Sequence, residues 1–342
     1  MLNRRSGVCY RKKREVSKIL ILFCTLAVVL WPRASVAAAQ TKSELHPSQR
    51  EDVTQIFMRN VLFRVMDDVV LKVDSLNGVM EPANPTQIIS LDDPNSFSLE
   101  MQAASTSISS KDLTNLVNSY ILPRAKTPIR DLTLTFNQDQ TISVTGKFHK
   151  LIDVPFEAKA SAQVTPDGNM RMHFSDMKVA GVISQNVLDF LGIKIAKIAQ
   201  PKRTQTFQIV GNDMIFPISE MFPPPRVSGK LRSISIAGNR LNLIFGKGDA
   251  NSVDNKPPFP LPATVKSYIY FHGGVMKFGI LTMGPVDMEL VSLKRSKPFE
   301  FSVARYYEQL LAGYSKSQPN KGLLVYMADY RNLKKTLSSS SK

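Results

Sequence analysis

The sequence contains only two cysteines, and neither lies in the part of the chain that we expect to fold. Cys9 and Cys24 both precede an alanine-rich stretch that ends at Ala39. Cleavage near Ala37 to Ala39 leaves a mature chain without a thiol, which excludes an intramolecular disulfide. Such a fold must be stabilised by its hydrophobic core alone, and a chain of 342 residues is long enough to bury one.

The sequence also lacks the groupings that usually carry catalysis or metal binding. Its four histidines are far apart, and none has a companion at metal-ligand spacing: His46, His149, His173 and His272. There is no Gly-X-Ser-X-Gly elbow, no Walker loop and no dinucleotide-binding glycine motif. We therefore expect no catalytic residue, no metal and no cofactor, and we interpret His272-Gly273-Gly274 as a glycine hairpin turn.

The first 39 residues have the composition of an export segment. Basic residues cluster between Arg4 and Lys18, and 13 uncharged residues follow from Ile19 to Trp31. This run is shorter than the ~20 residues that a helix needs to cross a bilayer, and small residues follow it. We expect either a cleaved secretory signal or an uncleaved N-terminal anchor. The absence of a glycosylation sequon favours a bacterial periplasm or cell envelope.

The charge balance is strongly basic. The whole chain carries +16, and the residues after Ala39 still contain 36 basic and 27 acidic residues, a net charge of +9. This excess favours either plain solubility or attraction to anionic lipid head groups at a membrane surface. No nucleic-acid partner is expected, because no basic–aromatic motif or reader element is present.

Apolar residues near the start of the mature chain recur at helical spacing. Met58, Leu62, Val65 and Val69 follow one another at intervals of four, three and four residues. This pattern predicts a long apolar helix from about Gln49 to Val69 that is buried along much of its length.

The period then changes to two. Apolar and polar residues alternate in four segments between Leu132 and Phe174, and the turn sequence Pro166-Asp167-Gly168-Asn169 precedes the last of them. The alternation predicts an antiparallel meander of long strands with one apolar and one wet face.

Shorter elements are expected on both sides of the meander. Helices are predicted at Lys111–Leu122, after a Ser109 or Ser110 cap and before a Pro123 stop, at Ser184–Ala199 and at Val303–Leu311. After a stiff Pro223-Pro224-Pro225 connector, strands are predicted at Val227–Ile236, Leu241–Phe245, Val265–Phe271 and Val275–Ile280.

These elements suggest four regions. They are an export segment at 1–39, a helix plus antiparallel sheet at 40–222, a β-rich continuation with a terminal helix at 223–313, and a tail at 314–342 with a disordered Ser-rich end.

One predicted strand carries three small residues in succession on its apolar face: Ala158, Ala160 and Ala162. Such a face either receives a closely packed helix or curls around a space that a ligand fills, because native interiors leave little empty space. The 13 methionines that remain after Met1 suit an adaptable apolar cavity. The candidate ligand-contacting residues are Leu134, Phe136, Val144, Phe148, Phe156, Ala158, Ala160, Ala162, Met170, Met172 and Phe174.

This order of elements resembles the tubular lipid-binding superfamily, and in particular its bacterial periplasmic members. The likeness is carried by Ile129–Leu191, through Leu-Thr-Leu-Thr-Phe (132–136), Ile-Ser-Val-Thr-Gly (142–146), Val-Pro-Phe-Glu-Ala (154–158), Val-Thr-Pro-Asp-Gly (164–168) and Val-Ala-Gly-Val-Ile (179–183). The residues after Pro225 depart from it.

The resemblance implies an α+β fold in which a long, curled antiparallel meander wraps around a long apolar helix, followed by additional C-terminal strands and a helix. Such a fold implies an apolar tunnel, and thus a non-enzymatic protein that binds and carries a lipid or other long apolar ligand in the cell envelope. The alternative is a structural or adaptor protein of the envelope, with the same fold and a core filled by side chains.

Overall fold

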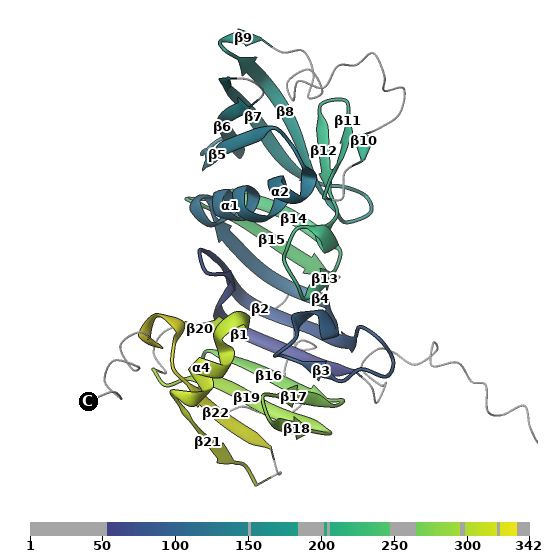
Figure 1. Ribbon diagram of the computed structural model, residues 1–342, viewed down its shortest axis with the longest axis vertical. Coiled ribbons are helices and arrows are strands. Elements are labelled where there is room, and N and C mark those ends of the chain that lie inside the picture. The colour runs from purple at the N-terminus through teal and green to yellow at the C-terminus, as the bar shows by residue number, and fades with distance from the viewer. Residues whose placement is uncertain are drawn as a thin grey trace, which may run out of the picture. The chain divides into compact units, whose positions relative to one another are not determined.

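The computed structural model describes residues 53–149, 152–183, 202–203, 206–246, 265–294, 298–319 and 322–333 (Figure 1). The export segment, the helix expected at 184–199, residues 247–264 and the Ser-rich end lie outside these ranges.

Strands dominate the described chain, and they form three sheets. The largest sheet has 11 strands in the order β14-β15-β4-β2-β1-β16-β19-β22-β21, with β13 beside β4 and β20 beside β1. Its strands are β1 (Thr54–Met66), β2 (Val69–Pro82), β4 (Phe97–Ser109), β13 (Arg226–Ser228), β14 (Leu231–Ala237), β15 (Arg240–Gly246), β16 (Tyr268–Gly273), β19 (Val286–Ser292), β20 (Phe299–Ser302), β21 (Tyr314–Ser317) and β22 (Leu323–Met327). Strands from both sides of the expected boundary at residue 222 therefore pair within one sheet.

The other two sheets are smaller. An 8-stranded sheet runs in the order β10-β11-β12-β8-β7-β6-β5, with β9 beside β8, and a 3-stranded sheet runs β18-β17-β3. Their strands are β3 (Ile89–Ser90), β5 (Ile129–Phe136), β6 (Thr141–His149), β7 (Asp153–Val164), β8 (Met170–Val179), β9 (Val182–Ile183), β10 (Lys202–Arg203), β11 (Gln208–Val210), β12 (Asp213–Phe216), β17 (Met276–Phe278) and β18 (Leu281–Met283).

The described helices are all short. They are α1 (Ser110–Leu116), a π-helical turn at Val117–Ile121, α2 (Leu122–Ala125) and α4 (Tyr306–Leu311), with 3-10 turns at Pro94–Ser96, Ile218–Glu220, Val303–Arg305 and Tyr330–Asn332. No long apolar helix occurs within the described ranges, and the sheets are open. The predicted fold, a curled meander wrapped around such a helix, is therefore wrong.

The helix predicted at Gln49–Val69 is replaced by strand β1 and the start of β2. Ile56 and Met58 face the main core, whereas Phe57 faces a second apolar cluster on the opposite side of the sheet. Asn60 then adopts a positive φ of 51°, and the residue that faces the main core next is Val61. Burial on both faces and this shift of phase together produce spacings of three and four residues, which imitate a helix.

The predicted four-stranded meander is present as β5 to β8, and neighbouring strands pair antiparallel. Its inward residues are buried and most outward residues are exposed, which the alternation of Leu134, Phe136, Ile142 and Val144 with Thr and Ser residues requires. This sheet could be predicted from the sequence because only one of its faces is buried.

The helical segment before the meander begins as predicted, since the Ser109 side chain accepts a hydrogen bond from the Asp112 amide (3.1 Å). The predicted stop at Pro123 is wrong. Pro123 follows the π-helical turn at Val117–Ile121, and the helical segment continues through it to Ala125. It ends at Lys126, which adopts a left-handed conformation.

The predicted C-terminal helix is confirmed as a 3-10 turn followed by α4. Three of the four strands predicted after Pro225 are present with shifted ends, as β15, β16 and β17. The other, predicted at Val227–Ile236, is divided into β13 and β14. Gly273-Gly274, however, does not join two paired strands: β16 pairs with β19 and β17 pairs with β18, so the glycines carry the chain from one sheet to another.

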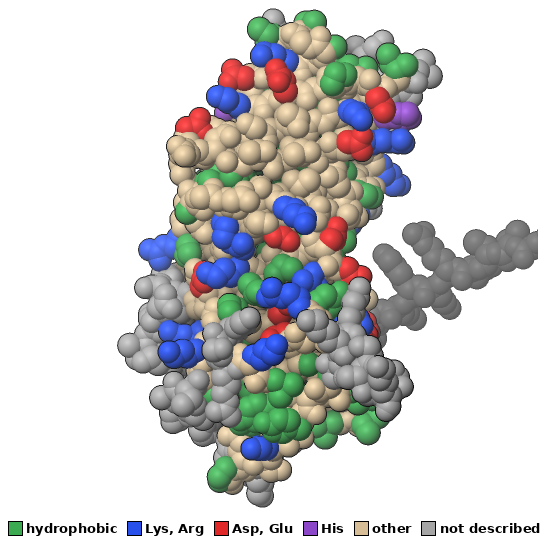
Figure 2. Space-filling model, turned by 90° about the vertical axis from the view of Figure 1, so that its left-hand side faces the viewer, with side chains coloured by type: hydrophobic (Ala, Val, Ile, Leu, Met, Phe, Trp, Pro, Cys, Tyr) green, Lys and Arg blue, Asp and Glu red, His purple; other side chains and the backbone are tan. Residues whose placement is uncertain are grey.

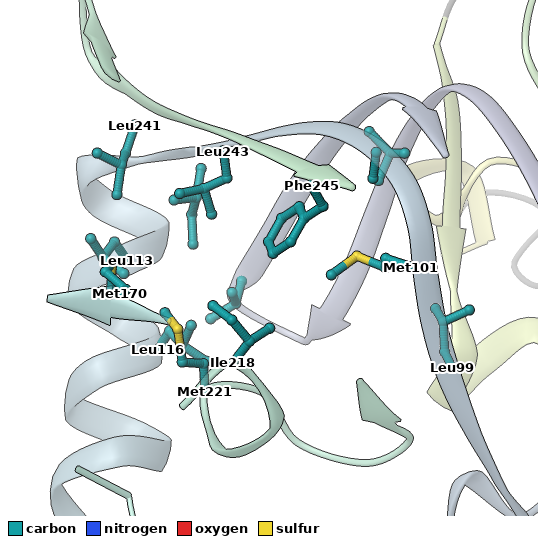
Figure 3. Packing of buried hydrophobic residues seen from close by; sticks show 14 of the residues in the cluster. Leu99, Met101, Leu113, Leu116, Met170, Ile218, Met221, Leu241, Leu243 and Phe245 are labelled. Atoms are coloured by element: carbon teal, nitrogen blue, oxygen red, sulfur yellow. The ribbon is translucent and has the colours of Figure 1, made fainter. Parts of the chain in front are cut away.

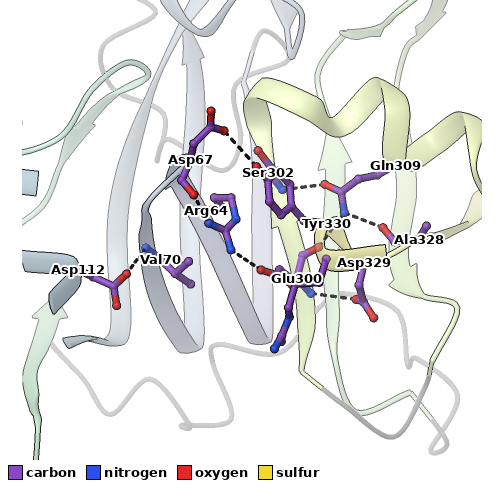
Figure 4. A network of polar contacts seen from close by, with 11 residues as sticks. Arg64, Asp67, Val70, Asp112, Glu300, Ser302, Gln309, Ala328, Asp329 and Tyr330 are labelled. Atoms are coloured by element: carbon purple, nitrogen blue, oxygen red, sulfur yellow. Dashed lines mark hydrogen bonds and ion pairs between the residues drawn. The ribbon is translucent and has the colours of Figure 1, made fainter. Parts of the chain in front are cut away.

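A polar network fixes the C-terminal elements against β1 (Figure 4). Glu300 is buried and accepts from Arg64 (2.6 Å) and Arg331 (2.5 Å). Gln309 of α4 accepts from the Ser302 amide (2.8 Å) and donates to the carbonyls of Glu300 and Ala328, each at 2.7 Å. Each Glu300 carboxylate oxygen accepts from one guanidinium group, so the network joins β1, β20 and the 3-10 turn at Tyr330–Asn332.

A candidate apolar ligand site

The meander and the helical segment at 110–125 enclose an apolar cavity of about 90 Å³. Figure 1 shows α1 and α2 between β5 and β15. Leu113, Val117 and Ile121 follow at intervals of four residues and form one wall, which the helical period explains. Every side chain that lines the cavity is apolar. Besides these three helical residues, the lining residues are Leu122, Ile129, Leu132, Leu134, Ile142, Val144, Phe156, Met170, Met172, Phe174, Phe207, Met214, Phe216, Met221 and Leu241.

Polar side chains next to the apolar wall of the helix hold it against strand β5. Asn118 donates to the Leu132 carbonyl (2.7 Å) and accepts from the Leu132 amide (3.1 Å). The Thr114 hydroxyl accepts from the Leu134 amide at 3.0 Å. These bonds satisfy the backbone of the edge strand and fix the distance between the two cavity walls.

Six of the eleven predicted ligand-contacting residues line this cavity: Leu134, Val144, Phe156, Met170, Met172 and Phe174. The other five lie elsewhere. Phe136, Phe148, Ala158 and Ala160 are buried in the packed core, and Ala162 is half-buried beside it. The alanines stand on β7, against which β14 packs, so their small size fits close strand packing.

The helical wall and the lining residues of β12, Met221 and β15 were not among the predicted ligand-contacting residues. Leu113, Val117 and Ile121 recur at helical spacing, so the sequence could predict that they share one face of a helix. It could not predict which elements that face contacts. Met214, Met221 and Leu241 reach the cavity only through pairings between segments far apart in the chain, such as that of β12 with β8.

A second apolar cavity, of about 70 Å³, lies between β1, β2, β4 and the 222–225 segment. Figure 3 shows Leu241, Leu243 and Phe245 in a row along β15. Leu241 lines the first cavity and Phe245 lines the second, while Leu243 is buried in the cluster that both border. One face of β15 thus borders both cavities, and the buried side chain of Leu243 lies between the residues that line them.

The histidines of the meander lie at its exposed surface. His149 and His173 contact Asp153 and Asp213, respectively, each at 2.7 Å, and all four side chains are partly solvent-exposed. Within the described residues no group of three His, Cys, Asp or Glu side chains is placed to hold a metal ion.

Glu289 is the most perturbed carboxyl group. It is 1% exposed, and burial, together with the negative charge of Asp287, raises its pKa to about 7. Its Oε1 has no hydrogen-bond partner within the described chain, and it lies on the face that carries Tyr268, Tyr270 and Val291.

None of the described helices is long and apolar enough to cross a membrane. No family model matches the sequence, and no match was found among curated proteins or solved structures. The likeness to tubular lipid-binding proteins remains a prediction from the quoted segments.

Proposed function

We propose that this protein binds an apolar ligand, such as the alkyl chain of a lipid, in the cavity between the β5–β8 meander and the helical segment at 110–125, and that it does so in the bacterial cell envelope. The observation that carries the proposal is a cavity whose eighteen lining side chains are all apolar. An unfilled apolar cavity costs stability, because its walls lack contact partners.

The size of the cavity sets the form of binding. About 90 Å³ is less than the roughly 150 Å³ apolar cavity that is known to hold benzene, so a long chain enters only if the walls move apart. Met170, Met172, Met214 and Met221 line it, and their flexible thioethers adapt their shape at low energetic cost. Each methylene transferred from water contributes roughly 0.8 kcal/mol, so a few buried methylenes offset a modest rearrangement.

Surface charge supports a location at lipid head groups. The chain after residue 39 carries +9, and Figure 2 shows Lys and Arg side chains gathered across the middle of one face. Attraction of this kind is weak and screened over about 8 Å at physiological salt, so it concentrates the protein at a surface without fixing it there.

The test is to fill the cavity and measure bound lipid and stability on the same preparation. Val144→Phe places a ring in the space, so the lipid that co-purifies from the host membrane should fall while the melting temperature is kept. Val61→Phe, at a fully buried position outside the cavity, should lower the melting temperature, and Val182→Phe, which is 70% exposed, should change neither quantity.

The filled-core adaptor gives the opposite result. In that case the wild-type protein carries no lipid by native mass spectrometry, and Val144→Phe is destabilised like Val61→Phe. This outcome would remove the proposal.

A further inference from the structure

A polar groove of about 620 Å³ lies next to the apolar cavities. Tyr120 and Arg124 line the groove, whereas their neighbours Ile121 and Leu122 line the first cavity. Phe222 and Pro224 line both the groove and the second cavity. Short segments of chain therefore separate a polar space from two apolar ones, and the volume of the groove falls within the range of small-molecule sites.

Most charges along the groove are already paired. Arg124 donates to the Tyr120 hydroxyl (2.8 Å) and to the Glu220 carboxylate (3.1 Å), and its guanidinium stacks 4.8 Å from the centre of the Tyr120 ring. Partial burial raises the pKa of Tyr120, which keeps this hydroxyl protonated. Arg124 and Glu220 thus offset each other, and the second carboxylate of the groove, Glu81, also has a partner.

Arg226 is the exception. It lies on β13, opposite Ser98 of β4, and its side chain is exposed and lines the groove. Among the described residues no ion pair or hydrogen bond occupies its guanidinium group. Arg226 is therefore the charged group of the groove that has no partner in the described chain, and a guanidinium binds the oxygens of phosphate or carboxylate through two parallel hydrogen bonds.

We propose that the ligand is an amphiphile with an oxyanionic head, phosphate or carboxylate, which Arg226 binds in the groove while the alkyl tail enters the adjoining apolar cavities. The inference rests on the proposed function for its tail site. Asn95, Ser98 and Ser219 line the same groove and offer amide and hydroxyl donors to the remaining oxygens of the head.

The experiment uses probes that share one tail. Binding of dodecanol, dodecyl phosphate and dodecyltrimethylammonium is measured by calorimetry, with inorganic phosphate as a fourth probe. Dodecanol is kept below its solubility limit, and the two ionic dodecyl probes are kept below their micelle concentrations. Dodecyl phosphate should bind about tenfold more tightly than dodecanol, as expected for hydrogen bonds to a charged group, and Arg226→Gln should abolish the difference. Arg130→Gln, which removes an exposed guanidinium outside the groove, is the matched control and should preserve it.

The outcomes separate the two proposals. If dodecanol and dodecyl phosphate bind equally and Arg226→Gln changes neither, the head site is overturned and the tail site stands. If neither probe binds, the proposed function itself fails. Inorganic phosphate that binds as tightly as dodecyl phosphate would show a site for the free ion, and preference for dodecyltrimethylammonium would show that the carboxylates, not Arg226, select the head.

Discussion

Strand β1 and the β5–β8 meander use the same kinds of apolar residue but bury them differently. The meander keeps one face wet, where Lys147 pairs with Asp131 at 3.0 Å and Lys178 with Glu157 at 3.1 Å, all partly exposed. In β1, by contrast, neighbouring residues enter apolar clusters on opposite faces. Alternation of apolar and polar residues with a period of two therefore indicates that one face of a strand is buried, and a strand buried on both faces lacks it.

Both regions contain residues with positive φ. The position of these residues in the strand determines how long the runs of alternating apolar and polar residues are. In the meander, Asp131 (φ 52°) and Asp176 (φ 49°) lie near strand ends, so long alternating runs remain between them. In β1, Asn60 (φ 51°) lies in the middle and splits a single strand into two short runs of opposite phase. Asn and Asp tolerate this conformation better than most residues.

The largest expected effect tests the two-sided burial of β1. Ile56→Ala and Phe57→Ala should each lower the free energy of unfolding by about 2–5 kcal/mol, because both side chains are at most 5% exposed. On β7, Phe156→Ala should lower the free energy of unfolding by a similar amount because Phe156 points inward, whereas Glu157→Ala should have little effect because Glu157 is exposed. Urea denaturation of the four variants checks this. A cost for Phe57→Ala as small as that for Glu157→Ala would show that the second face of β1 is not packed.

The next effect concerns the alanines of β7. Ala160 is 1% exposed and lies outside the cavity wall, so Ala160→Trp should overpack the core and cost about 3 kcal/mol, the upper end of such penalties. Lys159→Trp, one residue along on the outward face, should change stability by about 0.5 kcal/mol or less. Thermal melts compare the two. Equal melting temperatures would place ligand space, rather than packed side chains, against Ala160.

The same contrast explains how far the sequence could predict this structure. The meander followed from alternation, and the Ser109 cap and the start of the following helix followed from local chemistry. The large sheet did not, because partners such as β4 and β15, or β1 and β16, are joined by no signal within either strand. The long apolar helix was predicted because periodicity alone cannot distinguish a strand buried on both faces from a buried helix.

Six of the eleven residues predicted for the ligand site line the cavity, and the reason is related. Residues on the inner face of the meander were identifiable because they alternate with polar ones. Which of them border empty space, such as Val144, and which are packed, such as Ala158, depends on the elements that arrive from outside the meander. Arg226 carried no signal, since an exposed arginine on a short strand has no unusual sequence context.

The smallest expected effect concerns Glu289, which is buried on the outward face of the large sheet. The charged side chains on the outward face of the meander are, by contrast, exposed to solvent. Burial and Asp287 raise the pKa of Glu289 from 4.5 to about 7, so between these pH values the folded state holds a proton that the unfolded chain releases. Stability from this group is therefore present at pH 4.5 and is lost as the pH rises through 7. Between pH 5 and pH 8 the loss should be on the order of 2 kcal/mol.

Glu289→Gln keeps the shape and removes the charge, so it should be more stable than the wild-type protein at pH 8 and should flatten this part of the pH profile. Glu157→Gln, a change of the same chemistry on the wet face of the meander, is the control and should leave the profile unchanged. Urea denaturation at several pH values from 5 to 8 measures all three proteins. Parallel profiles for the wild type and Glu289→Gln would mean that this carboxylate is solvated, and that both sheets keep one face wet.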